Sequence, residues 1–464
     1  VAVVLGEWPG AGAAKGGFDA RLAKGKYTSH PGGRFEEHAR AFDGALAAGV
    51  AGVSTGRAIP EAGAWTAFGG AVNGATLEQV GASFNGTLLS GVLRDHLGFG
   101  GLVVAPAGVL EEPGLAPLGT PWGVEGLTRP QRIAKAVGAG VDLLVGLGDL
   151  DALAAAGLDD VRVAASATRV LTLAFRLGLF EDPYVDATTP GTIGGPTSTV
   201  EMYEVGLSSM YRGMVLLRNV QKPMGWLDGA GNGTQTNDPF NAGNGTMKVL
   251  PAPPGNPYLL IPNYAYFAGD FDLDYLRSVA TGYTEMTNAY PACMMGGAPI
   301  STAAERMACS DYVFVRIKAP WALDPDAGAL ELPTGALSYA STEAEVLAPV
   351  AAARAAIDAR AGSRAQLVVI VDGWRPSVVA ELLSDAYKVS ALYLDFSGAM
   401  SGNPYGDKAA LDVAFGIVDG TGKLPFALPA SDGAAASQLP DVQGDGADPT
   451  YVRGFGLQTK AFSR

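Results

Sequence analysis

The sequence predicts an α/β protein in which buried parallel strands alternate with helices. In the first third of the chain, short runs of β-branched and other apolar residues alternate with longer helical stretches. Strands that are almost entirely apolar are typical of parallel sheets covered on both faces. The same alternation returns in the second half of the chain, and it predicts a second α/β domain there.

Four strand–helix units follow one another in the first predicted domain, which we expect to span residues 1–185. Strands are expected at residues 1–5, 49–53, 101–104 and 141–145, and helices at 34–48, 88–96, 130–137 and 150–179. Four such units are half of a (β/α)₈ barrel, which needs eight strands. An open doubly wound sheet is the alternative that this pattern leaves open.

The second predicted domain spans residues 216–464, after a linker and lead-in helix at 186–215. The helix of this lead-in is expected to run over residues 200–217. Strands are expected at 258–261, 312–317, 366–371 and 389–394, and helices at 341–361 and 377–386. Residues 225–245 are rich in Gly, Asn, Asp and Thr, which is typical of a surface loop.

Charge and hydropathy exclude several classes of partner. The 464 residues carry 32 Lys and Arg against 46 Asp and Glu, a net charge of −14. An acidic chain without a basic face does not suit nucleic acid or an anionic lipid surface. No apolar run approaches the roughly 20 residues of a membrane span, so none is expected.

The two cysteines and the first residues bear on the cellular compartment. Cys293 and Cys309 fit no metal-binding spacing; they are either reduced core residues or one disulfide, and the Gly-, Pro- and Met-rich segment between them favours the disulfide. The chain opens without Met inside an apolar run at Val1. We therefore expect that something upstream has been removed or lies elsewhere.

Several long motifs, in the same order along the chain, resemble those of glycoside hydrolase family 3. They include LRDHLGFGGLVV, TRVLTLAFRLGLFEDPY, VLLRN, FGIVDGTGKLPF and FGL, which begin at residues 93, 168, 215, 415 and 455. The resemblance implies a barrel domain followed by an α/β/α sandwich domain, with a sugar site between them. It also implies an extracellular or periplasmic, β-glucosidase-like protein.

The resemblance further implies that this chain starts at the fifth strand of the barrel. A half-barrel has open sheet edges and an uncovered core. We therefore expect another chain, a cleaved fragment or a second copy in a homo-oligomer to complete it.

The residues that perform chemistry depart from the family pattern. A retaining glycosidase needs two carboxyl groups roughly 5–5.5 Å apart. Where the family places its nucleophilic Asp, at the end of the VVSD strand, this chain has Pro106, and the nearest downstream carboxylates are Glu111 and Glu112. The family's KHFPG segment corresponds here to GEWPG, with Glu7 and Trp8.

The family's acid/base segment corresponds here to Lys318-Ala-Pro-Trp321. The favoured hypothesis is a catalytically degenerate member that serves carbohydrate binding or assembly, with no catalytic residues. The alternative is an active exo-acting β-glycosidase with a relocated carboxylate pair, Glu7 with Glu111 or Glu112. Trp8 and Trp321 are candidates for stacking against sugar rings, and His30 is a further candidate for substrate binding.

No cofactor is expected. Oxygen-bearing side chains at Asp228, Asn232 and Asp238 could bind Ca²⁺. The EF-hand spacing is not met, because Ala230 occupies a ligand position, so a solvated acidic loop is the favoured interpretation.

Overall fold

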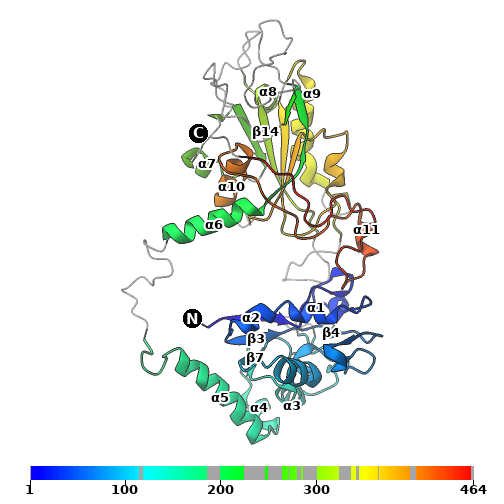
Figure 1. The fold of residues 1–464 in the computed structure, drawn as a ribbon, viewed down its shortest axis with the longest axis vertical. Coiled ribbons are helices and arrows are strands. Elements are labelled where there is room, and N and C mark those ends of the chain that lie inside the picture. Colours follow the sequence, from blue (N-terminus) through cyan, green and yellow to red (C-terminus); the bar gives the residue numbers. More distant parts are fainter. Residues whose placement is uncertain are drawn as a thin grey trace. The chain divides into compact units, whose positions relative to one another are not determined.

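The computed structural model divides the chain into two compact units. Unit 1 comprises residues 1–189, 323–335 and 438–445, and unit 2 comprises 190–322, 336–437 and 446–464. The structure describes residues 2–113, 119–184, 199–223, 246–248, 264–269, 271–279, 284–285, 300–322, 336–340, 344–363, 365–397 and 404–460. The two units are described separately below (Figure 1).

A four-stranded parallel sheet forms the centre of unit 1. Its order is β1 (Val4–Trp8), β3 (Gly52–Thr55), β7 (Leu102–Ala105) and β8 (Leu143–Leu144), and each neighbouring pair is parallel. The predicted parallel pairing is thus confirmed, although the fourth strand is shorter than expected. Because all four strands run the same way, their carboxyl ends meet at one edge of the sheet.

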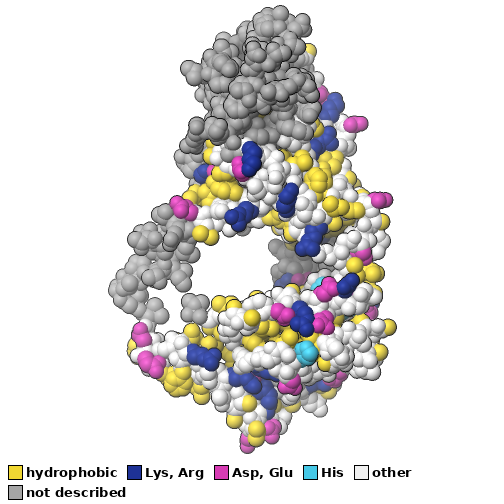
Figure 2. Space-filling model, viewed as in Figure 1, with side chains coloured by type: hydrophobic (Ala, Val, Ile, Leu, Met, Phe, Trp, Pro, Cys, Tyr) yellow, Lys and Arg dark blue, Asp and Glu magenta, His cyan; other side chains and the backbone are white. Residues whose placement is uncertain are grey.

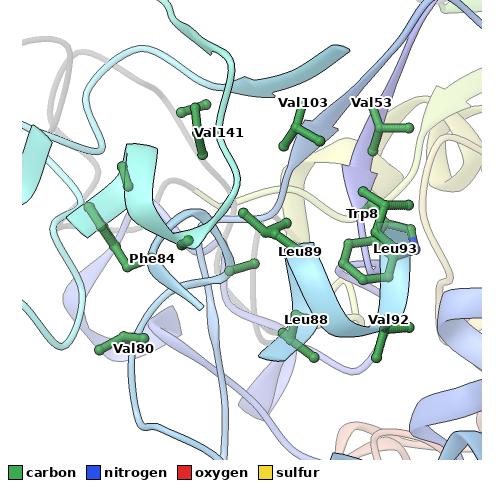
Figure 3. Close-up of a cluster of buried hydrophobic side chains, with 14 of the residues drawn as sticks. Trp8, Val53, Val80, Phe84, Leu88, Leu89, Val92, Leu93, Val103 and Val141 are labelled. Atoms are coloured by element: carbon green, nitrogen blue, oxygen red, sulfur yellow. The ribbon is translucent and has the colours of Figure 1, made fainter. Parts of the chain in front are cut away.

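The core of unit 1 lies between this sheet and two helices. The π-helix η5 (Thr87–His96) buries Leu88, Leu89, Val92 and Leu93, and α3 (Arg129–Ala139) follows a Thr128–Gln131 capping box. In Figure 3, Trp8 from β1 lies beside Leu93 of η5, with Val53 and Val103 from the neighbouring strands close by.

Two long helices predicted for unit 1 are interrupted. The stretch 34–48 forms α1 (Phe35–Arg40) and α2 (Asp43–Ala47). The stretch 150–179 forms α4 (Leu150–Ala155) and α5 (Asp160–Arg176). The second break occurs because Asp159 accepts a 2.9 Å hydrogen bond from the Arg162 amide and starts a new helix.

Helix α5 is amphipathic but buries none of its residues. Figure 2 shows apolar side chains at the surface over this helix. Val161, Leu171 and Phe175 are 77%, 49% and 59% exposed. A groove of about 1040 Å³ runs between α5 and the amino ends of β1 and β7, lined by residues such as Val3, Leu102 and Leu173.

Short elements complete unit 1. They are η1 (Lys15–Gly17), η2 (Ala23–Gly25), β2 (Tyr27–Thr28), β4 (Ile59–Pro60), β5 (Thr66–Ala67), η3 (Phe68–Gly70), β6 (Val72–Asn73) and η4 (Ala82–Phe84). A distant segment also belongs to this unit. The carboxylate of Asp441 accepts backbone hydrogen bonds of 2.9 Å from Gly32 and from Arg34, just before α1.

Unit 2 contains a six-stranded mixed sheet. Its order is β13 (Thr284–Glu285), β12 (Tyr264–Gly269), β14 (Tyr312–Lys318), β15 (Gln366–Asp372), β16 (Ala391–Asp395) and β9 (Met214–Asn219). All pairs are parallel except β16 with β9. A separate antiparallel pair joins β10 (Gln221–Pro223) to β11 (Thr246–Lys248).

Helices cover both faces of this sheet. One face packs on α9 (Ala348–Ala359) through Val350 and Ile357. The other packs on α7 (Leu273–Val279) and α10 (Pro404–Ala414) through Leu276 and Val413. The remaining helices are α6 (Thr199–Gly213), α8 (Ala303–Cys309), η7 (Ala344–Leu347), η8 (Val379–Leu383) and α11 (Asp432–Ala436).

Two predictions for unit 2 were wrong in detail. The lead-in helix ends at Gly213, and the predicted last turn is instead strand β9, because Met214 and the residues after it pair with β16. The helix predicted at 377–386 is the short 3₁₀ helix η8. The strand predicted at 258–261 lies outside the described residues.

Two findings concern the membrane and the cysteines. Within the described residues, no helix has the length and apolar character needed to cross a membrane. Cys309, the last residue of α8, is disulfide-bonded. Cys293, the other cysteine of the chain, lies outside the described residues.

Candidate functional site

The carboxyl edge of the unit 1 sheet gathers a cluster of charged side chains. Glu7 lies near the end of β1, and Arg57 follows β3. The two strand ends are joined by a 2.6 Å hydrogen bond from the Gly56 amide to the Trp8 carbonyl. In parallel α/β sheets this edge is where ligands bind, so these groups mark the candidate site.

Arg57 connects the ends of three strands. Its Nε lies 3.5 Å from Oε1 of Glu7. Its Nη1 donates to the carbonyl of Ala107, beyond β7, at 2.8 Å and to Oγ1 of Thr120 at 3.1 Å. The Arg57 side chain is only 14% exposed, whereas that of Glu7 is 36% exposed. Arg57 is therefore fixed in place, and the Glu7 carboxyl is the group presented to solvent.

A second ion pair lies beside Glu7. Asp19 accepts two hydrogen bonds from the guanidinium of Arg21, at 2.9 and 2.8 Å, and the charges of Glu7 and Asp19 interact. Burial raises the pKa of Glu7, and nearby Arg57 only partly offsets this. Burial also opposes ionisation of Asp19, but the Arg21 hydrogen bonds outweigh it and lower the pKa of Asp19.

The two carboxyl groups therefore differ in protonation behaviour. Environments that move the pKa values of neighbouring carboxyl groups apart are a property of acid–base sites. Glu7 binds its proton more tightly than a free glutamic acid does, and Asp19 binds its proton less tightly than a free aspartic acid does. The cluster of Glu7, Asp19, Arg21 and Arg57 can thus hold polar ligand groups through both donors and acceptors.

Pro106 directly follows β7 at the same edge. It lines a shallow pocket beside β8 that is also lined by Glu111. Arg129, at the start of α3, donates a 2.6 Å hydrogen bond to the carboxylate of Glu111 and forms an ion pair with it. Glu112 pairs with Arg132 at 2.8 Å, and its side chain is 60% exposed. Glu111 and Pro106 line the same pocket, whereas Glu112 is not among its lining residues.

Two residues predicted to contact sugar, Trp8 and His30, are buried in unit 1. Trp8 is 0% exposed and belongs to the core of unit 1, so it has no ring face for a sugar. His30 is 4% exposed and packs against the rings of Phe35 and Trp65, with centroids at 5.1 and 5.5 Å. Burial lowers the pKa of His30 to about 4, so it is a neutral core histidine.

Trp321 lies in unit 2, just beyond β14. Its indole contacts that of Trp374, with ring centroids 4.5 Å apart. Unlike Trp8, both rings lie outside the fully buried core.

The residues of the disfavoured Ca²⁺ site cannot be placed in the structure. Asp228, Asn232 and Asp238 lie outside the described residues. Among the residues that are described, no group of three or more His, Cys, Asp or Glu side chains is arranged to hold a metal ion.

Sequence reasoning missed three members of the charged cluster: Asp19, Arg21 and Arg57. Arg57 and Ala107 are 50 residues apart in the chain, and no local motif marks their contact. The position of Arg57 four residues beyond the strand predicted at 49–53 was a usable signal, because groups that follow the carboxyl ends of parallel strands converge.

Comparisons with known proteins give a consistent answer. No protein-family model matches the sequence. The chain is 26% identical over 464 residues to probable β-glucosidase C of Aspergillus oryzae, covering 98% of this chain and 59% of the relative. It is 34% identical over 232 residues to the periplasmic β-glucosidase/β-xylosidase of Dickeya chrysanthemi, covering 47% of this chain and 34% of the relative.

The fold agrees with these sequence matches. A crystal structure of β-glucosidase from Listeria innocua in complex with isofagomine superimposes with a TM-score of 0.62 at 18% identity, covering 99% of this chain and 58% of the other. The molecule is therefore a mixed α/β protein related to β-glucosidases. Both the sequence and the fold are thus similar to those of β-glucosidases, and the chain spans about 59% of the length of the Aspergillus oryzae relative.

Proposed function

We propose that this chain is a catalytically degenerate relative of β-glucosidases that binds carbohydrate without hydrolysing it by double displacement. The observation that carries this proposal is Pro106. Its ring stands directly after β7, where the family resemblance implies the attacking carboxylate. A proline has no nucleophilic group, and losing the nucleophile removes the covalent intermediate of the retaining mechanism.

The charged cluster at the same edge supports a binding role. Glu7 presents a carboxyl group that can accept hydrogen bonds, and Arg57 lies behind it at 3.5 Å. Sugar hydroxyls need such paired donors and acceptors. Carbohydrate is also what the name β-glucosidase implies for the relatives, and this ligand class is taken over here as part of the proposal.

We further infer that unit 1 is the second half of a (β/α)₈ barrel and that unit 2 is an α/β/α sandwich. The order of the four parallel strands and the helices on both faces of the six-stranded sheet support this. Completion of the barrel by further strands would cover the apolar face of α5. Val161 and Phe175 on that helix are more than half exposed, which is costly for apolar surface in an isolated protein.

A secreted location completes the proposal. The disulfide at Cys309 is typical of an oxidising compartment such as the periplasm or the extracellular space. The name of the Dickeya relative includes the word periplasmic.

The proposal is tested by measuring hydrolysis and binding in the same preparation. We expect no release of 4-nitrophenol from 4-nitrophenyl β-glucoside, and we expect calorimetric binding of cellobiose that weakens in Glu7→Gln. Asp95→Asn, a substitution in η5 outside the charged cluster, is the matched control. Turnover that disappears on substitution of one carboxylate of this chain would overturn the proposal.

Two observations favour a second candidate, an exo-acting β-glycosidase with relocated carboxylates. Glu111 lines the pocket that Pro106 lines, and Glu7 has a raised pKa, as a general acid requires. If this alternative is correct, Glu7→Gln and Glu111→Gln will each lower kcat by at least about 100-fold. Glu112→Gln, whose side chain is exposed, will leave kcat unchanged.

A further inference from the structure

Two tryptophans converge at the carboxyl edge of the unit 2 sheet. Trp321 lies three residues beyond β14 and Trp374 two residues beyond β15. The two strands are parallel neighbours, with Lys318 opposite Asp372 at their ends. This register brings residues 53 positions apart in sequence to the same place, and their indole centroids are 4.5 Å apart with planes tilted by 52°.

The pair is not needed to fill the core beneath it. The apolar cluster under this edge is formed by side chains such as Ile317, Ala319 and Val371, which are at most 3% exposed. Trp374 is 38% exposed, and Trp321 is half-buried. A large aromatic side chain that keeps more than a third of its surface in water is available to a ligand.

A charged group lies beside the exposed Trp374 ring. The guanidinium of Arg375 lies 5.6 Å from the centroid of the Trp374 ring, and its Nη1 donates to the carbonyl of Pro320 at 3.4 Å. This contact links the segment that carries Trp321 to the segment that carries Trp374. Lys318, at the end of β14, is exposed on the same edge.

We propose that Trp321 and Trp374 form a stacking platform for a pyranose ring, a carbohydrate-binding site built entirely from unit 2. The apolar C–H face of a pyranose packs on an indole face, and rigid aromatic side chains provide such area at little conformational cost. Arg375 and Lys318 supply hydrogen-bond donors for the sugar hydroxyls at the rim. The ligand class rests on the proposed function, whereas the site itself does not include the Glu7 edge.

The platform differs from another exposed aromatic pair in the described part of unit 2. Tyr203 on α6 and Tyr405 on α10 are 38% and 41% exposed, with centroids 5.2 Å apart. Tyr203 lies on a helix and does not follow a parallel strand of the sheet. It therefore provides a control of equal exposure for the effect of deleting a surface aromatic.

The test is calorimetric titration of the full chain with cellotetraose, combined with saturation-transfer NMR on the sugar protons. We expect Trp374→Ala and Trp321→Ala each to weaken binding about tenfold, Trp374→Phe to retain most of the affinity, and Tyr203→Ala to have no effect. In the wild type, the pyranose C–H protons should receive the strongest saturation.

The outcomes separate this inference from the proposed function. If affinity falls in Glu7→Gln but is unchanged in both tryptophan variants, the platform is refuted and the proposed function stands. If the tryptophan variants lose affinity and Glu7→Gln does not, the platform stands and the Glu7 site is refuted. If cellotetraose does not bind the wild type at millimolar concentration, both are refuted. Unfolding curves of Trp374→Ala and Trp374→Phe show whether a loss reflects the ring or the fold.

Discussion

The charged clusters at the carboxyl edges of the two sheets differ in their balance of acids and bases and in their burial. In unit 1, Glu7 and Asp19 face Arg21 and Arg57, so two acids balance two bases, and Glu7 is 36% exposed. In unit 2, one arginine faces three aspartates. Arg316 contacts Asp372, Asp395 at 2.8 Å and Asp407 at 2.9 Å, and all four residues are at most 3% exposed.

The difference shows where a charged cluster is suited to binding and where it determines stability. Half-exposed balanced charges are screened by water and contribute little to folding, so they are free to meet a ligand. A buried cluster with excess negative charge depends on its one cation and on bound protons. The three predictions below test this contrast.

The largest effect is expected from Arg316→Met. It leaves the carboxyl groups of Asp372, Asp395 and Asp407 buried without their shared cation, which should lower the free energy of unfolding of unit 2 by about 3–5 kcal/mol. Denaturant unfolding monitored by circular dichroism measures the change. Arg277→Met removes an exposed arginine that pairs with Asp274 and Glu285 and should have no measurable effect. Equal effects of the two substitutions would contradict the contrast.

An intermediate effect is expected from Asp372→Asn, and it depends on pH. Burial raises the pKa of Asp372 to about 6, with Arg316 opposing and Asp395 and Asp407 adding to the rise. Because the folded state binds this proton more tightly than the unfolded chain, the stabilisation is complete below about pH 4 and is lost as pH rises through about 6.

The measurement is therefore the slope of stability against pH. Between pH 4 and 7, the wild type should lose on the order of 2 kcal/mol relative to Asp372→Asn. Burial also raises the pKa of Asp407, which adds to the slope in both proteins and so does not affect the comparison. Parallel pH profiles of the wild type and the variant would show that Asp372 is ionised throughout.

The smallest effects are expected at the unit 1 edge, and they have opposite signs. The pKa of Asp19 is lowered, so its stabilisation is present above about pH 4 and is lost as pH falls. The pKa of Glu7 is raised, so its contribution is present at low pH and is lost as pH rises. Asp19→Asn and Glu7→Gln should each change stability by less than about 1 kcal/mol, with pH slopes of opposite sign. Larger changes in stability would show that the charged cluster of unit 1 contributes to folding as the buried cluster of unit 2 does.

The parts of the fold that were predicted correctly are those that local pattern determines. Strands β3, β7, β14, β15 and β16 are runs of apolar residues whose burial on both faces matches their composition. The break between α4 and α5 had a local signal, the Gly157-Leu-Asp159 sequence with its capping aspartate, but the apolar pattern on either side obscured it. The switch from helix to strand at Met214 had none, because pairing with β16 decides it.

The candidate site was predicted less completely, for a physical reason. Glu7 and Pro106 were found because each adjoins a strand with a recognisable motif. Trp8 was assigned to the wrong face, since neighbouring strand residues point to opposite sides and only the packed core shows which is buried. Arg57, Asp19 and the Trp321–Trp374 contact depend on the register between strands, which the linear sequence does not contain.

The Asp441 carboxylate has a practical consequence for how unit 1 can be produced. It satisfies two backbone amides next to α1 although more than 400 residues separate it from them. A truncated protein that stops at the first interdomain linker would leave these amides to water and would expose the adjoining surface. Recombinant expression of the N-terminal region alone should therefore yield a less stable protein, unless residues 438–445 are fused to it or added as a peptide.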